Sequence, residues 1–375
     1  MMQRYNSYKK CIIFTSNFFN IMQIQSTSYP VLFGNTSYEA LSQLINEKKY
    51  SKIIVLVDDN TSKFCLNIVL QWLAISVDFE IIEIEHGEES KTIHSCNEIW
   101  QSLIDLQIDR KALLLNVGGG VVCDLGGFIA ATYKRGIDFV NIPTTLLAMV
   151  DASVGNKTAI NFGGLKNMIG SFYEPKMVLI DVNFLETLPS NHMRSGLAEM
   201  FKHGLIADVS YWNQLKNMSE LTVEDLELLI YHSVSIKNEI VLQDPHEENV
   251  RKLLNFGHTL GHVLETQSMV SNTMQPLLHG EAVAVGMVLE AFISYQKGLL
   301  TKNSYLEIKE TLNLMFEGIV LTKNDIEICT SLLVHDKKNE QGVIQFTLLN
   351  EIGEGVFNQL VDNEIIEKAF QEYLS

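Results

Sequence analysis

The 375-residue chain is predicted to fold into two domains, an α/β domain on a doubly wound parallel sheet followed by a mainly α-helical domain. Two observations give this prediction. From about Ser51, short β-rich segments alternate with longer amphipathic ones, which is typical of βα units and a parallel sheet. After Pro175 the segments that stand out are helix-like. The boundary is expected near residues 170 to 181, and a cleft between two such halves is a common place for a ligand.

The individual elements follow from the apolar pattern. Residues 112–117 are almost wholly apolar, as expected for a strand that is buried on both faces of a parallel sheet. Strands are predicted at 52–57, 79–84 and 112–117, with helices at 64–75 and 95–106. In the second half, helices are predicted at 199–206, 223–242, 251–265, 281–297 and 364–373.

The composition narrows the class of protein. Apolar residues make up 46% of the chain and charged residues 19%, with only 6 Pro, which disfavours a disordered or collagen-like chain. The net charge of −17 would repel a polyanion, so nucleic-acid binding is not expected. The five cysteines are odd in number and widely spaced, which favours reduced thiols in the cytoplasm over a disulfide framework.

The first residues imitate a secretion signal. Lys9 and Lys10 precede a short apolar run at 11–14, but polar residues interrupt it and no small-x-small cleavage site follows. We interpret residues 1–22 as a leader outside the fold, with the start codon at Met1 or Met22 left open and a true signal as the alternative. The domains are then expected at 23–175 and 176–375. No stretch reaches the roughly 18 uncharged apolar residues that a membrane span needs, so a soluble, cytoplasmic protein without a membrane partner is expected.

A glycine-rich turn follows the buried strand directly. The run Gly118-Gly119-Gly120 leads into helix-like sequence, and glycines let backbone amides at a helix start approach a pyrophosphate. The pattern is compatible with a Rossmann-like nucleotide-binding domain, although it is not the usual G-x-G-x-x-G motif. A tight turn that needs glycine only for packing is the open alternative.

Two further segments could contact a nucleotide. Asp58 ends the first strong strand and could hold ribose hydroxyls, although an aspartate there could equally cap the next helix. Glu88 and Lys91 follow a later strand, where a solvated charged turn is the alternative interpretation.

Four residues of the second half have the character of metal ligands. His258 and His262 are four apart and share one face of a helix, His279 begins another helix, and Glu199 lies in a helix-like stretch where a buried carboxylate would need a partner. A carboxylate and two or three imidazoles match a catalytic divalent site, usually zinc. The spacing is not H-E-x-x-H, so a metalloprotease mechanism has no support. Isolated surface or core histidines are the alternative.

Cations and amides gather in Gly-rich or apolar sequence despite the acidic composition. Such groups suit a polar, anionic, hydroxylated ligand, whereas scattered lysines usually mark a solvated face. The set comprises Lys134, Arg135, Asn156, Lys157, Asn161, Lys166 and Asn167 beside Asp151, with Lys202, Lys237, Arg251 and Asn255 from the helical half.

These motifs occur together in a fixed order. The first half has Gly118-Gly119-Gly120-x-x-x-Asp124, Tyr133-Lys134-Arg135-Gly136, Pro143-Thr144-Thr145, Asp151-Ala152-Ser153-Val154-Gly155-Asn156-Lys157-Thr158 and Lys166-Asn167-Met168-Ile169-Gly170. The second half has Gly196-Leu197-Ala198-Glu199-Met200-x-Lys202, Arg251-x-x-x-Asn255-x-Gly257-His258-Thr259-x-Gly261-His262 and His279-Gly280-Glu281-Ala282. From about Ser51 to Gly353 the chain therefore resembles 3-dehydroquinate synthase, of the sugar phosphate cyclase superfamily. It departs at Asn156, where a glycine is common, and at His203, where a tyrosine is common.

The resemblance implies a lyase of the shikimate pathway, which leads to chorismate and the aromatic amino acids. The family converts 3-deoxy-D-arabino-heptulosonate 7-phosphate into 3-dehydroquinate and phosphate, with NAD and a divalent metal, zinc or cobalt. It oxidises a ring hydroxyl transiently, eliminates phosphate, reduces the ketone and closes the carbocycle by an intramolecular aldol reaction. The resemblance also suggests a homodimer.

The resemblance implies a role for each matching residue. The metal ligands would be Glu199, His258 and His279. Phosphate would be surrounded by Arg135, Lys157, Asn167, Asn255 and His262, and the carboxylate and hydroxyls by Lys166, Lys237 and Arg251, with Lys202 also catalytic. NAD would be bound by Asp58, Asn60, Glu88, Lys91, Gly119, Gly120, Asp124, Thr144, Thr145, Asp151, Lys157, Lys166 and Thr187. Lys337 or Lys338 would also reach the cleft, and the choice between them is open.

Three other functions stay open at this point. Another sugar phosphate cyclase, such as a 2-deoxy-scyllo-inosose or valiolone synthase, acts on a substrate without the carboxylate, and Arg251 and Asn255 favour an acidic substrate. A metal-dependent polyol dehydrogenase would not need this many cations. A non-catalytic nucleotide-binding module would need neither Lys157 nor the set of metal ligands.

Overall fold

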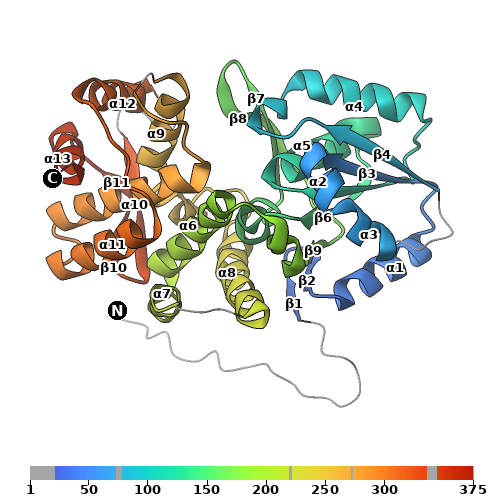
Figure 1. The fold of residues 1–375 in the computed structure, drawn as a ribbon, viewed down its shortest axis with the longest axis horizontal. Helices are drawn as coiled ribbons and strands as arrows, with labels where there is room; N and C mark the ends of the chain where they lie inside the picture. The colour runs from blue at the N-terminus through green and yellow to red at the C-terminus, as the bar shows by residue number, and fades with distance from the viewer. Residues whose placement is uncertain (1–21, 73–77, 219–221, 272, 336–343, 375) are drawn as a thin grey trace, which may run out of the picture.

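The computed structural model describes residues 22–72, 78–218, 222–271, 273–335 and 344–374. A seven-stranded sheet with helices around it forms the N-terminal half, and helices with one two-stranded sheet form the C-terminal half (Figure 1). The predicted fold class is therefore confirmed. The leader predicted at residues 1–22 lies outside the described residues except for Met22, whose carbonyl accepts a hydrogen bond from Phe33 N at 3.1 Å. Met22 thus belongs to the fold.

The large sheet has the strand order β1-β2-β9-β6-β5-β3-β4. Its neighbouring strands are parallel except for the antiparallel pair β1 and β2. Its strands are β1 (Gln23–Gln25), β2 (Pro30–Phe33), β3 (Ile53–Asp58), β4 (Phe79–Ile84), β5 (Leu113–Gly118), β6 (Asp138–Pro143) and β9 (Val178–Ile180). The three predicted strands are confirmed to within one residue at each end. Strand β9 lies within the boundary region predicted at residues 170 to 181 and pairs with β2 and β6.

Helices cover both faces of this sheet. They are α1 (Thr36–Lys48), α2 (Asp59–Phe64), α3 (Leu66–Trp72), α4 (Ile93–Asp105) and α5 (Gly120–Thr132). The single helix predicted at 64–75 is wrong at its start. Helical structure already begins at Asp59, because Asp58 and Thr61 form a capping box, and it is interrupted at Cys65. The end of that prediction, residues 73–75, lies outside the described residues.

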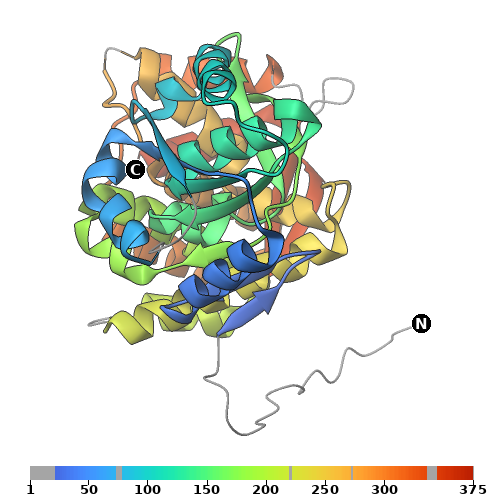
Figure 2. The same cartoon turned by 90° about the vertical axis from the view of Figure 1, so that its right-hand side faces the viewer.

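The alternation of side chains along each strand divides the core of the sheet. Ile54 and Leu114 pack on the face covered by α4 and α5, whereas Val55 and Leu115 belong to a larger cluster on the other face. That larger cluster continues into the helical half through Phe201. The second view shows the strands enclosed between helices (Figure 2). One apolar core therefore joins the halves and fixes the helical residues relative to the sheet.

A hairpin that the sequence analysis did not predict lies at the border of the halves. It consists of β7 (Lys157–Phe162) and β8 (Leu165–Phe172), joined at Gly163 and Gly164, both with positive φ. Figure 1 shows it projecting beside the sheet toward the helical half. Gly-Gly between two β-rich runs is a hairpin signal, so this hairpin is recognisable from the sequence.

The helical half carries the predicted metal ligands. Its longer helices are α6 (Ser190–Ala207), α7 (Val209–Lys216), α8 (Val223–Gln243), α9 (His258–Val270), α10 (His279–Gln296), α11 (Lys302–Met315), α12 (Lys323–His335) and α13 (Asn363–Tyr373). The hairpin of β10 (Gln345–Glu351) and β11 (Glu354–Leu360) was not predicted.

Short helical turns occur in both halves of the chain. They are η1 (Glu88–Ser90), η2 (Tyr133–Arg135), η3 (Ala148–Ala152), η4 (Val182–Thr187) and η5 (Val250–Asn255).

The helix predicted at 251–265 is wrong as a single element. The turn η5 ends at Asn255, and Gly257 adopts a left-handed conformation with φ of +78° before α9 begins at His258. A left-handed residue ends one helix and lets the next take a new direction. The predicted shared face of His258 and His262 is unaffected, because both lie in α9.

The described cysteines Cys65, Cys96, Cys123 and Cys329 are buried free thiols, as the sequence analysis expected. None of the described helices has the length and apolar composition needed to cross a membrane.

Candidate active site

Strands β3 and β5 are neighbours in the sheet although β4 lies between them in the sequence. The chain therefore moves outward from β3 to β4 and then returns to build the sheet in the other direction. Ligands of open α/β sheets bind outside the carboxyl ends of the strands at such a switch point. Asp58 ends β3 and Gly118 ends β5. Thr144, after β6, donates its backbone N–H to the Gly118 carbonyl at 3.0 Å. The first residues predicted to bind NAD are thus at one edge of the sheet.

The geometry of the glycine turn is compatible with both of its interpretations. A Cβ atom on Gly118 would lie 2.5 Å from Val122 Cβ, so close packing alone requires glycine there. Gly119 precedes α5 and no side chain caps this helix, which leaves the backbone N–H groups of its first turn available to an anion. A Cβ on Gly119 or Gly120 would meet Thr145 Cγ2 at 3.1 Å or Ala152 Cβ at 3.3 Å.

Lys91 connects three predicted site residues. Its side chain is buried, and Nζ donates to Asp124 Oδ2 and to Asn167 Oδ1, each at 2.6 Å. Burial alone would lower the pKa of Lys91, but the carboxylates of Asp124 and Glu88 raise it above its usual value. Glu88 also accepts a hydrogen bond from Asn161 Nδ2 at 2.8 Å. The charged segment after β4 is therefore attached to α5 and to the β7–β8 hairpin, and is not a purely solvated turn.

The contacts of Asp58 and of the predicted threonines point less clearly to a nucleotide. Asp58 Oδ1 accepts the Thr61 N–H at 2.7 Å, which is the helix-cap geometry, so a ribose contact stays a prediction. Thr144 Oγ1 is buried without a hydrogen-bond partner, and Thr145 Oγ1 accepts the Ala148 N–H at 3.2 Å. Thr187 is exposed at the end of η4.

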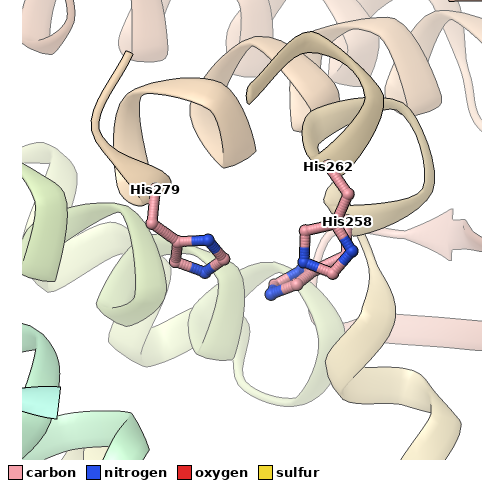
Figure 3. A group of neighbouring side chains, drawn as sticks. All are labelled: His258, His262 and His279. Atoms are coloured by element: carbon pink, nitrogen blue, oxygen red, sulfur yellow. The ribbon is translucent and has the colours of Figure 1, made fainter. Parts of the chain in front are cut away.

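Glu199, His258 and His279 form what we call the metal cluster. Nε2 of His258 and Nε2 of His279 each lie 3.5 Å from Oε1 of Glu199, which is fully buried in α6. Figure 3 shows the imidazole of His279, at the start of α10, and those of His258 and His262, on α9, facing a common space. One ring nitrogen of each histidine lies within 4.8 Å of the others. The residues predicted as ligands are thus brought together, with His262 beside them.

The geometry of the metal cluster fits a divalent metal. Ligands at 2.0 to 2.2 Å from a tetrahedral zinc are separated from one another by about 3.3 to 3.6 Å, which includes the two 3.5 Å separations. Oε1 of Glu199 is buried without a hydrogen-bond partner, which is costly unless another group satisfies it. Lys202 forms an ion pair with Glu199 Oε2 and leaves Oε1 to the two imidazoles.

The other nitrogen of each imidazole is held by the protein. Nδ1 of His258 lies 3.1 Å from the Phe256 carbonyl oxygen, and Nδ1 of His279 lies 3.3 Å from Glu265 Oε2. When Nδ1 carries the proton and donates it to these acceptors, Nε2 presents a lone pair toward Glu199. Metal-binding histidines usually have such partners, because they fix the tautomer and the direction of the ring.

Charges around the metal cluster control its protonation. Burial alone would raise the pKa of Glu199, but Lys202, His258 and His279 hold it well below its usual range. His203 is buried, with Nδ1 2.7 Å from Ser233 Oγ, and burial together with Lys202 lowers its pKa to about 3. With this lowered pKa, the His203 ring is neutral at physiological pH. An oxygen of Asp151, an oxygen of Glu199 and a nitrogen of His203 lie within 4.8 Å of one another.

Two more predicted lysines approach the same carboxylates. Nζ of Lys237 donates to the carboxylate and to the backbone carbonyl of Asp151, both at 2.5 Å. Nζ of Lys166 donates to Glu265 Oε1 at 2.7 Å. Through Glu265 and His279, Lys166 is linked to the metal cluster.

A second group, which we call the Glu247 cluster, consists of Lys157, Glu247, Arg251 and Asn255. The Glu247 carboxylate pairs with Lys157 and accepts from Asn255 Nδ2 at 2.8 Å. Arg251 is buried and donates to the backbone carbonyls of Pro245 at 2.6 Å and Gly155 at 2.8 Å, while its Nε is buried without a partner. Partial desolvation lowers the pKa of Lys157, and Glu247 opposes that shift. The Glu247 carboxylate is thus bound by Lys157 and Asn255, two residues that were predicted to hold phosphate.

Some predicted residues are not joined to these contacts. Arg135 and Asn60 are exposed and take no part in the ion pairs of the described residues given above. Lys337 and Lys338 lie outside the described residues.

Two residues of these clusters, Glu247 and Glu265, were not predicted from the sequence. Glu265 could have been found, since it lies seven residues after His258 and three after His262 on the same helix, where it can share their face. Glu247 lies between two helical elements with φ of +62°, and no periodic pattern marks it.

Comparisons with known proteins identify the family. Residues 81–195 match the model of the 3-dehydroquinate synthase N-terminal domain, and residues 196–339 match that of the C-terminal domain. The chain belongs to the 3-dehydroquinate synthase family. It is 40% identical over 335 residues to the 3-dehydroquinate synthase of Parabacteroides distasonis, covering 89% of this chain and 94% of that protein. It is 37% identical to the synthase of Ruminiclostridium cellulolyticum, covering 93% of this chain and 97% of that protein. The chain is accordingly an enzyme.

Solved structures of other cyclases share the fold. A 2-deoxy-scyllo-inosose synthase complexed with carbaglucose-6-phosphate, NAD⁺ and Co²⁺ superposes with a TM-score of 0.81 at 23% identity, over 93% of this chain and 99% of that one. The 2-epi-5-epi-valiolone synthase of Streptomyces hygroscopicus, with NAD⁺ and Zn²⁺ bound, gives 0.77 at 27% identity, over 93% of this chain and 98% of that one.

Proposed function

We propose that this 3-dehydroquinate synthase family member converts 3-deoxy-D-arabino-heptulosonate 7-phosphate into 3-dehydroquinate and phosphate, as a step toward the aromatic amino acids. The observation that carries the proposal is the pair of 3.5 Å approaches to Glu199 Oε1, beside a group of lysines suited to an anionic substrate. The family match over residues 81–339 supports the same substrate.

Glu199, His258 and His279 would hold a divalent metal, zinc or cobalt. The metal would supply Lewis acidity toward the substrate hydroxyl that is oxidised. Phe256 and Glu265 keep the histidine Nε2 atoms directed at Glu199, so the ligand set is arranged before any metal enters. The zinc-bound and cobalt-bound cyclase structures support both metals.

NAD would lie along the carboxyl edge of the sheet and accept and return a hydride. Gly119 and Gly120 at the start of α5 would receive its pyrophosphate, and Asp58 its ribose. Lys91 would hold Asp124 and Asn167 in place between the nucleotide and the hairpin.

The Glu247 cluster would receive the substrate phosphate. Lys157 and Asn255 already meet a carboxylate there, and an incoming phosphate would compete with it for the same donors. Arg251 is fixed by two backbone carbonyls and keeps its buried Nε–H for an acidic substrate group. These residues bind and orient, and the departing phosphate itself could act as the base of the elimination.

The direct test is incubation of the purified chain with the heptulosonate phosphate and catalytic NAD. Phosphate and dehydroquinate should appear together in equal amounts, without net NADH. Phosphate release without dehydroquinate, or no reaction with the metal-loaded protein, would contradict the proposal.

Another sugar phosphate cyclase activity is the second candidate, because the fold matches the 2-deoxy-scyllo-inosose synthase with a TM-score of 0.81. Glucose 6-phosphate and sedoheptulose 7-phosphate, which lack the carboxylate, distinguish the activities. We expect turnover only of the heptulosonate, since buried Arg251 suits an acid.

We further propose a cytoplasmic homodimer with an NAD domain at 23–175 and a metal and substrate domain at 176–375. The apolar side chains of Phe162, Leu165 and Phe172 on the β7–β8 hairpin, each at least half exposed, support an interface between two copies. The mass in solution, measured by light scattering, tests this arrangement, and a monomer at micromolar concentration would contradict it.

A further inference from the structure

Helix α9 begins without a cap from its own sequence. Gly257, which precedes His258, has φ of +78° and no side chain, and no local side chain accepts a hydrogen bond from the first turn. The backbone N–H groups at a helix start have no partner within the helix. In this buried place they need an acceptor from elsewhere in the molecule.

Glu290 of α10 supplies that acceptor. Its side chain is fully buried, Oε2 accepts the Gly257 N–H at 2.7 Å, and Oε1 accepts the Leu260 N–H at 3.1 Å. A carboxylate at this end also interacts favourably with the partial positive charge of the helix start. Each oxygen therefore fixes one amide on either side of His258.

The close approach of the two helices depends on Gly286, which lies one turn before Glu290 in α10. A Cβ atom on Gly286 would lie 2.0 Å from the Gly257 carbonyl oxygen and 2.8 Å from the Gly261 nitrogen. The backbones are thus in direct contact at this point. Glu290 attaches the start of α9 to α10, the helix that also carries His279.

His258 is the first residue of α9, between the two amides that Glu290 holds. Its Nδ1 faces the Phe256 carbonyl and its Nε2 lies 3.5 Å from Glu199, so its ring has little freedom relative to the backbone. A shift of the helix start would carry Nε2 away from Glu199. We propose that Glu290 is a positioning residue that sets His258 for the metal, an inference that rests on the metal site proposed above.

The test is the zinc affinity of the full-length Glu290→Gln variant, measured by competition with a chromophoric chelator. Glutamine keeps the size of the side chain but replaces one acceptor oxygen by an NH₂ group, which would face a backbone N–H. Loss of partners around metal ligands typically weakens binding 10- to 100-fold, and we expect about tenfold here. The visible spectrum of the Co²⁺-loaded variant should also change, because the ligand geometry changes.

Asp325 provides a matched control at the other end of α9. It is a buried carboxylate that accepts from Gln267 Nε2 and Ser271 Oγ, both at 3.1 Å, and so anchors the C-terminal part of the helix. Asp325→Asn should lower the melting temperature and leave the zinc affinity and the Co²⁺ spectrum unchanged. A purely structural role for Glu290 predicts the same behaviour for both variants.

The outcomes are distinct. Wild-type zinc affinity in Glu290→Gln, or an equal loss in Asp325→Asn, would overturn the role of Glu290 and leave the proposed function intact. A wild-type chain that binds no zinc would overturn both. If Glu290→Gln does not fold, Glu290→Asp takes its place, because the carboxylate is then withdrawn by one methylene and zinc binding should weaken again.

Discussion

The metal cluster and the Glu247 cluster, the two parts of the proposed active site, differ in how their charged groups are satisfied. In the metal cluster, the buried Glu199 pairs with Lys202 through Oε2 and keeps Oε1 for the two imidazoles, whose Nδ1 atoms face Phe256 and Glu265. In the Glu247 cluster, the Lys157 side chain is 46% exposed and already paired. A resident cofactor requires a site fixed in advance, whereas a substrate anion must be able to exchange with a carboxylate.

The largest expected effect comes from breaking the metal cluster. Glu199→Gln should remove bound metal and lower turnover by roughly three powers of ten, because metal assistance is worth about 4 kcal/mol at the transition state. Chelation of the wild type should abolish activity, and added zinc or cobalt should restore it. The control is Glu80→Gln, and its metal content and kcat are compared with those of Glu199→Gln. Glu80 forms an ion pair with Lys52 at the start of β3 and β4, away from the carboxyl ends of these strands. Full turnover by metal-free enzyme would contradict the proposed role of the metal.

The next effect should come from the Glu247 cluster. Lys157→Ala removes one cation from the anion site and should lower kcat about a hundredfold, as for loss of one preorganised charge contact of about 3 kcal/mol. Because the side chain is 46% exposed, the melting temperature should hardly change. Lys52→Ala is the control, with both values near wild type. A near-wild-type kcat for Lys157→Ala would make this lysine a solvated surface residue.

A smaller effect should separate ligands from their supports within the metal cluster. Glu265→Gln keeps an oxygen for His279 but loses the charge that also pairs with Lys166, and it should weaken zinc about tenfold. Turnover at saturating zinc should recover most of the wild-type rate, which Glu199→Gln cannot do. If activity stays low even at saturating zinc, Glu265 takes part in the reaction itself.

The two clusters also differ in how far the sequence revealed them. The i,i+4 spacing of His258 and His262 is local, so a shared helix face followed from the sequence alone. The glycine turn after the apolar segment similarly marked the edge of the sheet, and β5 lies within one residue of its prediction.

Long-range pairings could not be obtained in this way. The contact of Lys157 with Glu247 joins residues 90 positions apart, and that of Glu290 with Gly257 depends on helices packed through glycines. The left-handed Gly257 also divides what looked like one helix from 251 to 265. Periodicity describes a face of one element, whereas these features arise from the tertiary arrangement of several.

The smallest expected effect concerns a buried carboxylate outside both clusters. Burial alone would raise the pKa of Asp325, but hydrogen bonds from Thr322, Gln267 and Thr273 hold it well below its usual value. A group with a lowered folded pKa stabilises the protein above its unfolded pKa of about 3.9 and loses that contribution as the pH falls through the folded pKa. Asp325→Asn should therefore cost on the order of 2 kcal/mol at pH 7, as for hydrogen bonds to a charged group.

That cost should shrink as the pH falls below about 4, because Asp325 then takes up a proton in the unfolded chain while it stays ionised in the folded protein, and it disappears only when the pH falls through the lowered folded pKa. Urea unfolding of both proteins at pH 7 and at pH 3 measures the difference, and kcat at pH 7 should be the same for the two. An equal difference at both pH values would mean that the charge of Asp325 contributes nothing. A drop in kcat would mean that the C-terminal end of α9 also acts on the metal cluster. The position of a carboxylate along this helix would then not distinguish a structural role from a functional one.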